Sequence, residues 1–91
     1  MNTDFTTSFL KAIDKVSEVS VMEAIERAIL SVEDATMLRD IANLRKLKKC
    51  RNGTSYRIRV GNYRIGVEIL GNTVTFAAFG HRKDIYKSFP R

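Results

Sequence analysis

A chain of 91 residues with 44% hydrophobic residues and one proline is long enough for one small folded domain and too short for two. Sixteen lysines and arginines against ten aspartates and glutamates give a formal net charge of +6, which favours a polyanionic partner such as nucleic acid or an acidic protein. A single cysteine excludes an intramolecular disulfide and a thiolate metal cluster, and no stretch is long and apolar enough to cross a bilayer. We therefore expect a single cytoplasmic domain over residues 1–91, with no cofactor and no membrane contact.

The charge is distributed unevenly along the chain. Residues 1–44 carry four basic and eight acidic side chains, a net charge of −4, whereas residues 45–91 carry twelve basic and two acidic side chains, a net charge of +10. The second half is therefore expected to meet the polyanionic partner.

The N-terminal residues predict a short strand and a first helix. Residues 2–5 form a candidate edge strand. Thr6 or Thr7 is a suitable N-cap for a helix that ends near Ser17 and carries an apolar stripe of Phe9, Leu10, Ile13 and Val16.

A second helix follows. Ser20 and Glu23 have the spacing of a capping box, and apolar residues then repeat at helical spacing to about residue 33. Two consecutive helices with a short break predict an αα-hairpin that covers the apolar face of a sheet.

The densest positive charge lies at residues 45–51, in the run RKLKKCR. A further helical segment after Asp34, through Met37, Leu38, Ile41 and Leu44, is expected to lead into it. The run is either a solvated loop or helix end, or a surface that follows a nucleic-acid backbone. We favour the second interpretation and predict RNA contacts at Lys46, Lys48 and Lys49.

Three runs rich in β-branched and aromatic residues alternate with period two and predict strands at 56–60, 63–70 and 73–79. Gly61-Asn62 and Gly71-Asn72 separate them, and both pairs suit two-residue hairpin turns. The sequence therefore predicts an α+β fold, a small antiparallel β-sheet with an N-terminal αα-hairpin packed on one face.

Such turns also predict the register of the strands. The expected apolar face pairs Val60 with Tyr63, Ile58 with Ile65, Tyr56 with Val67, Val67 with Phe76 and Ile65 with Ala78. The expected opposite face places Arg57 beside Gly66 and Ala77, Arg59 beside Arg64 and Phe79, and Glu68 beside Thr75.

Two arginines, Arg59 and Arg64, thus meet across one hairpin. Like charges directly opposite each other destabilise a hairpin, and a bound anion would relieve their repulsion. The small residues Gly66 and Ala77 predict a trough beside the arginines, with room for a phosphate-bearing ligand. The alternative is a solvated face on which the arginine stems lie along the sheet.

The last strand leads into the motif GHRKDIY at 80–86, which brings further functional groups to the same end of the sheet. The predicted cluster offers cations, hydrogen-bond donors, an aromatic surface and one group that titrates near neutrality. Its members are Arg57, Arg59, Arg64, Arg82 and Tyr86, with His81 nearby.

The segments YRIRVGNYRI at 56–65 and FGHRKDIY at 79–86 resemble the RelE/ParE superfamily of bacterial and archaeal toxins, most closely the RelE-like mRNA interferases. The resemblance implies a RelE-like fold and the toxin of a type II toxin–antitoxin system. Such toxins cut mRNA in the ribosomal A site and are inhibited by a cognate antitoxin protein. By this resemblance Arg57 and Arg59 take the basic positions of the second strand, Arg64 is the phosphate-binding arginine, Arg82 follows the last strand and Tyr86 is the C-terminal tyrosine.

RNA cleavage sets chemical requirements of its own, independent of this resemblance. RNA supplies its own nucleophile, the 2′-hydroxyl, so the protein has to align it with the phosphate, stabilise negative charge and move protons. Arg64 and Arg82 suit the second task, because a guanidinium donates two parallel hydrogen bonds and keeps its charge. His81 suits proton transfer. RelE-like enzymes often lack a histidine there and carry lysine in place of Arg57 and Arg59, so the general base stays open between His81 and Arg59.

Tyr86 is expected to stack on a base or to orient the attacking hydroxyl, and its alternative role is packing with Ile85 and Phe89. The alternative for His81 is a turn residue that faces solvent. Because the sequence shows no carboxylate pair, metal-ligand cluster, nucleophile elbow or phosphate-binding glycine loop, we expect a metal-independent ribonuclease.

Two other functions fit the same resemblance. One is a ParE-like inhibitor of DNA gyrase, which would be a binding protein rather than a nuclease. The other is a catalytically degenerate toxin fold that only binds its partner or RNA.

Overall fold

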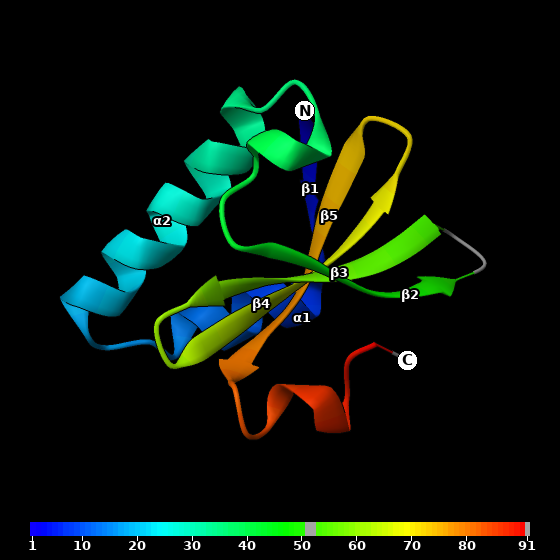
Figure 1. Ribbon diagram of the computed structural model, residues 1–91. Coiled ribbons are helices and arrows are strands. Elements are labelled where there is room, and N and C mark those ends of the chain that lie inside the picture. Colours follow the sequence, from blue (N-terminus) through cyan, green and yellow to red (C-terminus); the bar gives the residue numbers. More distant parts are fainter. Residues whose placement is uncertain (51–52, 91) are drawn as a thin grey trace.

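The computed structural model describes residues 1–50 and 53–90, and the described part forms a five-stranded sheet with strand order β1-β5-β4-β3-β2 (Figure 1). The elements in chain order are β1 (Asn2–Phe5), α1 (Thr7–Asp14), α2 (Val19–Asp34), the 3-10 helix η1 (Leu38–Asp40), β2 (Leu44–Cys50), β3 (Gly53–Val60), β4 (Tyr63–Leu70), β5 (Thr73–His81) and the 3-10 helix η2 (Ile85–Lys87). The predicted α+β class and the antiparallel arrangement of β3, β4 and β5 are confirmed. Because β1 runs parallel to β5, the sheet as a whole is mixed.

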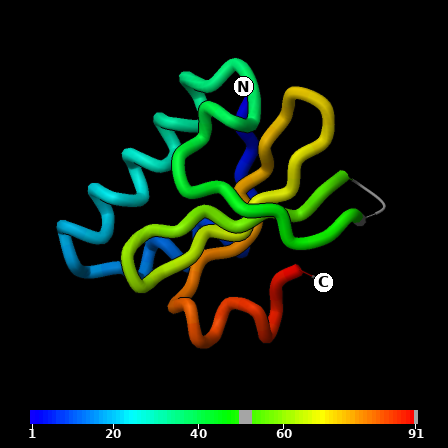
Figure 2. The backbone as a smooth tube through the Cα atoms, viewed as in Figure 1, coloured from blue at the N-terminus to red at the C-terminus, as the bar shows by residue number. Residues whose placement is uncertain are grey.

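The predicted N-terminal strand and the first helix cap are both confirmed. In Figure 2 the N-terminal strand lies against β5, and the pairing runs from Asn2 opposite Thr73 to Phe5 opposite Phe76. The hydroxyl of Thr6 accepts a hydrogen bond from the Phe9 N–H at 3.1 Å, so Thr6 is the N-cap. The α1 helix ends at Asp14, earlier than predicted, because its last turn tightens into i→i+3 hydrogen bonds.

The second helix covers the sheet as predicted, but its start differs. It begins at Val19, with Glu18 as an N-cap that makes no side-chain hydrogen bond, so the predicted capping box of Ser20 and Glu23 is wrong. Both residues lie inside the first turns of the helix. The stripe along α2 is buried, most completely at Ile25 and Val32, which belong to the same core as Phe9 of α1.

The predicted helical segment between Asp34 and the basic run is also wrong. Only the short η1 forms there. Residues 45–50 of the basic run belong to strand β2, which pairs with β3, and Arg51 lies outside the described residues. The carboxylate of Asp40 accepts hydrogen bonds from the hydroxyl and N–H of Thr36 and from the Met37 N–H, which hold this segment in a tight loop. Asn43 then adopts a left-handed φ of 63° and turns the chain into β2.

The predicted register between β3 and β4 is confirmed at every pair, including Arg59 opposite Arg64. Between β4 and β5 the pairs Val67–Phe76 and Glu68–Thr75 are confirmed, but Ile65 lies opposite Phe79 rather than Ala78. The reason is a bulge at Ala77, whose carbonyl accepts a hydrogen bond from the Thr6 hydroxyl.

That bulge changes the surroundings of Arg64. It moves the Phe79 side chain to the apolar face, where the ring stacks on Tyr63 with centroids 5.2 Å apart. Gly80 instead of Phe79 then lies opposite Arg64. No bulky side chain of β5 therefore stands directly across from this arginine.

The opposite face of the sheet carries a second, smaller cluster of buried side chains. Ile85 and Phe89 are only 4% and 5% exposed, and α2 and η2 lie on opposite sides of the sheet (Figure 1). A Cβ added to Gly66 would lie 2.5–2.8 Å from ring atoms of Phe89. The trough predicted beside Gly66 is therefore filled by the Phe89 ring. In the described part of the chain, no helix is long and apolar enough to span a membrane.

The Asp40 loop generates a first prediction. The hydrogen bond from the Thr36 side chain, followed by that from the Met37 N–H, lowers the pKa of Asp40 from its ordinary value of 3.8. A lowered pKa in the folded state means that the ionised carboxylate stabilises the fold above pH 3.8 and loses this effect as the pH falls through the lower folded value. Asp40→Asn should therefore reduce the free energy of unfolding at pH 6, and the difference from wild type should shrink by pH 3.

Urea unfolding at both pH values measures this difference, with Asp34→Asn as the control for loss of one exposed negative charge. A difference that is equal at pH 6 and pH 3 would contradict the role of the ionised carboxylate.

The contact between Gly66 and Phe89 generates a second prediction. Gly66→Ala should lower the free energy of unfolding by about 1–3 kcal/mol, because the ring has to move to admit the methyl group. Gly80→Ala is the matched control, since its added Cβ would lie 3.8 Å from the Ile85 Cβ, an ordinary contact. In a double-mutant cycle the cost of Gly66→Ala should largely vanish in a Phe89→Ala background. Equal costs in both backgrounds would mean that the ring does not restrict this position.

Candidate nucleic-acid interface

Two pairs of arginines face each other across neighbouring strands. Arg45 of β2 lies opposite Arg57 of β3, and Arg59 of β3 lies opposite Arg64 of β4. Each like-charge pair is unfavourable for the sheet when considered alone. The sequence predicted only the second pair, because it did not predict that β2 is a strand.

Backbone carbonyls, rather than carboxylates, contact two of these guanidinium groups. Arg57 donates to the carbonyl of Asn43 at 2.8 Å, and Arg64 donates to the carbonyls of Gly61 and Tyr63, both at 2.9 Å. Within the described residues, no ion pair joins either arginine to an aspartate or glutamate. The positive charge of this surface is therefore not neutralised within the described chain.

An open groove of about 690 Å³ collects most of these cations. Its lining residues come from β2, β3, β4 and the C-terminal segment and are Arg45, Lys46, Leu47, Arg57, Arg64, Arg82, Lys83 and Tyr86. The lining holds six cations and no acidic residue, together with an aromatic ring that is 48% exposed. This composition suits a phosphate backbone with an adjacent base.

A bulge at Leu47 shapes the β2 wall of the groove. Lys46 pairs with Tyr56 and Lys48 with Ser55, so Leu47 is the extra residue of β2. A bulge interrupts the alternation of side chains between the two faces. Arg45, Lys46 and Leu47, three consecutive residues that reach the bulge, all line the groove.

The electrostatics of the groove are clearest at Arg57. Partial burial lowers the pKa of its guanidinium, Tyr86 opposes this effect, and the neighbouring cations Arg64, Arg45 and Arg59 lower the pKa further. An arginine nevertheless keeps its charge at neutral pH. Arg57 is thus a partly desolvated cation among other cations, an environment in which a phosphate oxygen gains more than it does in water.

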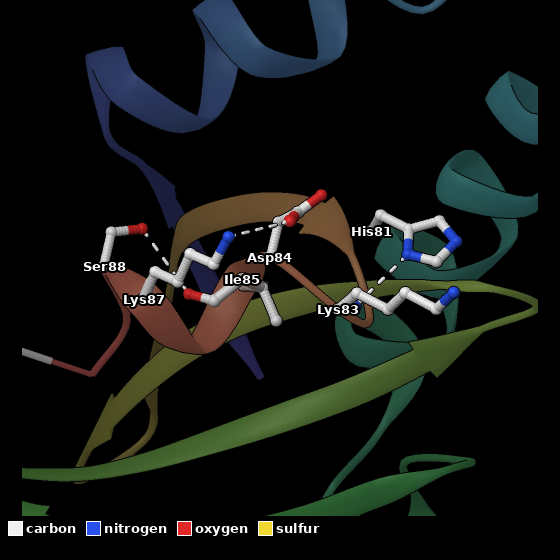
Figure 3. A network of polar contacts seen from close by, with 6 residues as sticks. All are labelled: His81, Lys83, Asp84, Ile85, Lys87 and Ser88. Carbon is white, nitrogen blue, oxygen red and sulfur yellow. Dashed lines mark hydrogen bonds and ion pairs between the residues drawn. The ribbon is translucent and has the colours of Figure 1, made fainter.

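The C-terminal segment places Tyr86 and Arg82 at the groove. Figure 3 shows the hydrogen bonds that shape this segment, including the Lys87–Asp84 ion pair at 3.4 Å and the bond from the Ser88 hydroxyl to the Ile85 carbonyl at 3.5 Å. Ile85 is buried against the sheet while Tyr86 remains exposed. The alternative role expected for Tyr86 was packing with Ile85 and Phe89. Those two residues are buried, and Tyr86 is not.

The groove contains some of the predicted site residues and not others. Inside it are Lys46, Arg57, Arg64, Arg82 and Tyr86. Arg59 lines a separate cleft beside α2, although it lies opposite Arg64 in the sheet. Lys48 and Lys49 are exposed on β2 beyond the bulge. His81 lies outside the groove, in a cleft on the α2 side of the sheet.

Sequence reasoning missed three lining residues. Arg45 and Leu47 were missed because a helical segment was expected to lead into the basic run, and no strand was predicted there. Lys83 belongs to the motif GHRKDIY, but no role was predicted for it. The run RKLKK at 45–49 shows no period-two alternation, so no local signal in the sequence could have identified Arg45 as part of a strand.

The described residues contain no group of three or more histidines, cysteines, aspartates or glutamates placed to hold a metal ion. Nothing in the lining of the groove is a preferred metal ligand, since its polar side chains are cationic or phenolic. The arrangement is suited to bind an anion directly.

Comparisons with known proteins agree with this architecture. The family model described as the ParE toxin of the type II toxin-antitoxin system parDE matches residues 4–86. A curated relative, Toxin RelE3 of Methanocaldococcus jannaschii, is 38% identical over 87 residues, which cover 94% of this chain and 96% of the relative.

Solved structures show the same fold. The RelB-RelE antitoxin-toxin complex from Methanococcus jannaschii contains a chain that is 36% identical, with a TM-score of 0.75 and coverage of 96% of this chain and 99% of that chain. The archaeal RelE-RelB complex from Pyrococcus horikoshii OT3 matches with a TM-score of 0.68 at 16% identity, over 91% of this chain and 96% of that chain, which supports the fold alone. The family model, the curated relative and the fold agree, and the chain belongs to the RelE/ParE superfamily of type II toxin–antitoxin toxins.

Proposed function

We propose that this protein is an endoribonuclease that cleaves messenger RNA on the ribosome, as the toxin of a type II toxin–antitoxin pair. The observation that carries the proposal is the groove between β2 and the C-terminal segment, with six cations, one exposed tyrosine and no acidic residue. The match to a relative named Toxin RelE3 supports it.

The proposed reaction uses the ribose as its own nucleophile. The 2′-oxygen attacks the adjacent phosphorus, the bond from phosphorus to the 5′-oxygen breaks, and a 2′,3′-cyclic phosphate and a 5′-hydroxyl result. The proton leaves the 2′-hydroxyl, and a proton is gained by the departing 5′-oxygen. This route requires alignment and stabilisation of the extra negative charge, and a bound metal is not part of it.

Arg64 and Arg82 are proposed to bind the reacting phosphate, while Arg57 and Arg45 face them from β3 and β2. A guanidinium donates paired hydrogen bonds that strengthen as negative charge develops on the phosphate oxygens. Tyr86 lines the C-terminal wall, and we expect it to stack on a base or to orient the attacking hydroxyl. Lys46 and Lys83 extend the positive surface along the RNA backbone, and Lys48 and Lys49 continue it on β2.

A general base would take the proton from the 2′-hydroxyl. Neither Arg59 nor His81, the two groups considered for this role, lines the groove. Their positions support a mechanism in which alignment and charge stabilisation provide most of the rate enhancement.

An acidic antitoxin is the proposed protein partner. The chain that is 36% identical to this one was solved in a RelB-RelE antitoxin-toxin complex. In this chain the uncompensated cations of the groove would attract an acidic segment, and complementary charge accelerates association. We propose that the antitoxin covers this basic side and keeps RNA out, and that the protein acts in the cytoplasm.

A second candidate function is inhibition of DNA gyrase, which the description of the matching family model favours. A basic groove also fits DNA. If the purified protein inhibits DNA supercoiling by gyrase and does not cleave RNA, these results would support this function in place of the first.

The mechanism predicts the chemistry of the product ends. RNA cleaved in a translation reaction should carry a 2′,3′-cyclic or 3′-phosphate on one fragment and a 5′-hydroxyl on the other. An mRNA with a 2′-deoxynucleotide at the mapped site is the matched control, and it should remain uncleaved there. Fragments with 5′-phosphate and 3′-hydroxyl ends would show attack by water and exclude the mechanism.

A further prediction concerns Arg64. Arg64→Ala should reduce cleavage by roughly 10²- to 10³-fold, as expected when a group that stabilises transition-state charge is removed. Arg64→Lys should lie between this variant and wild type, because it keeps the charge but not the guanidinium fork. The free energy of unfolding should change by only about 1 kcal/mol, because relief of repulsion from Arg59 offsets the lost hydrogen bonds to carbonyls.

Cleavage rate and urea unfolding are measured on the same preparations, with Arg39→Ala as a control arginine outside the groove. An Arg64→Ala protein that is strongly destabilised and still cleaves mRNA at the wild-type rate would assign this arginine a structural role only.

A further inference from the structure

His81 lies apart from the groove that holds the other residues of its motif. His81 pairs with Tyr63 across β5 and β4. The imidazole and the Tyr63 ring form a T-shaped contact, with centroids 5.7 Å apart and planes at 77°. Tyr63 is itself stacked on Phe79. The imidazole thus packs against one aromatic ring, that of Tyr63, on the α2 side of the sheet.

The backbone after His81 forms a tight turn in which three successive N–H groups each have an acceptor. The Arg82 N–H donates to the carbonyl of Asn62 at 2.9 Å, the Lys83 N–H donates to Nδ1 of His81 at 3.2 Å, and the Asp84 N–H donates to the carbonyl of His81 at 2.9 Å. Figure 3 shows the bond between the imidazole and Lys83. His81 therefore supplies two of the three acceptors of this turn.

The turn connects the sheet to the groove. Arg82 and Lys83, its central residues, both line the groove, and Ile85 directly beyond it is buried against the sheet. A change in the backbone at Lys83 would shift the two cations relative to Arg64. Misplacement of a binding group by a small distance is costly for a reaction that depends on alignment.

From these contacts we infer that His81 is a positioning residue: its neutral imidazole, through Nδ1, accepts the Lys83 N–H and fixes the turn that holds Arg82 and Lys83 in the groove. This role rests on the proposed nuclease function only for its effect on cleavage. It replaces proton transfer as the role of this histidine.

The protonation state follows from the hydrogen bond. An imidazole nitrogen accepts a hydrogen bond only when it carries no proton, so the neutral ring holds its proton on Nε2. A proton shuttle at this position would break the bond to Lys83 each time Nδ1 was protonated. The charged or titratable groups around the ring are Tyr63, Glu18 across the cleft, and Arg82, Lys83 and Asp84 of the turn itself.

Three substitutions separate positioning from proton transfer. In His81→Asn the amide oxygen stands at the same distance along the side chain as Nδ1 and can accept from the N–H two residues later, as in an Asx-turn. In His81→Gln the acceptor is one bond farther from the backbone, and in His81→Ala there is none. Asparagine does not titrate, so it preserves the hydrogen bond and removes any proton shuttle.

The expected cleavage rates follow from the size of each effect. His81→Asn should stay within about threefold of wild type, whereas His81→Gln and His81→Ala should lose roughly three- to tenfold, the effect of one hydrogen bond of ordinary strength. Loss of a general acid or base would instead cost about 10²- to 10⁴-fold in all three variants. Urea unfolding of each variant shows whether a lower rate arises from loss of folded protein.

Nuclear magnetic resonance tests the inference without any nuclease activity. In wild type, nitrogen-15 spectra of the imidazole should show an unprotonated Nδ1 and a protonated Nε2 at a pH where the ring is neutral. The Lys83 amide should exchange slowly with solvent in wild type and His81→Asn, and at least several-fold faster in His81→Gln. If wild type cleaves no RNA, the proposed function fails while these measurements still decide the role of His81.

Either of two kinds of result, spectroscopic or kinetic, would overturn the inference. One is a proton on Nδ1 of the neutral ring, or a Lys83 amide that exchanges equally fast in wild type and His81→Gln. The other is a loss of cleavage of a hundredfold or more in folded His81→Asn, equal to that in His81→Ala, which would restore proton transfer as the role of this histidine.

Discussion

Arginines lie opposite each other across adjacent strands, and the rest of the sheet has to offset the repulsion between them. Each of the two pairs costs the sheet about 0.2–1 kcal/mol relative to neutral pairs, by the usual size of cross-strand effects. The other face of the same strands buries Ile58, Val60, Ile65 and Val67, and each such side chain contributes about 1.5–3 kcal/mol on burial. The apolar face therefore outweighs the repulsion several-fold, and the strands can hold like charges side by side.

Two bulges convert a flat charged face into a groove. The bulge at Ala77 moves Phe79 to the apolar side and leaves Gly80 opposite Arg64, so that the arginine has space around it. The bulge at Leu47 lies at the end of three consecutive residues of β2 that line the groove. Bulges commonly redirect side chains beside functional sites, and here each one adds access or charge to the same surface.

The C-terminal segment covers part of this face of the sheet. Its apolar side chains are buried there, and its cations and tyrosine remain exposed. Ile85 and Phe89 are buried over β4 and β5, where Gly66 leaves the Phe89 ring its space. Arg82, Lys83 and Tyr86 remain at the groove. Packing of a few apolar side chains thus determines where the cations and the tyrosine lie, and it explains why the space beside Gly66 is occupied by protein while the groove lies nearer to β2.

Much of this protein follows from its sequence alone. The Gly-Asn turns determine the pairing of β3 with β4, and with it the meeting of Arg59 and Arg64, because a two-residue hairpin leaves one register. The amphipathic stripes determine the two helices, and the paired motifs of the second half indicate the superfamily. Tertiary structure decided that residues 45–50 of the basic run form a strand, since an edge strand is stabilised by hydrogen bonds to a partner that its local sequence does not specify. It also decided that Arg45 and Lys83 join the groove and that His81 does not, because bulges and a turn held by long-range contacts determine on which face of the sheet a side chain emerges.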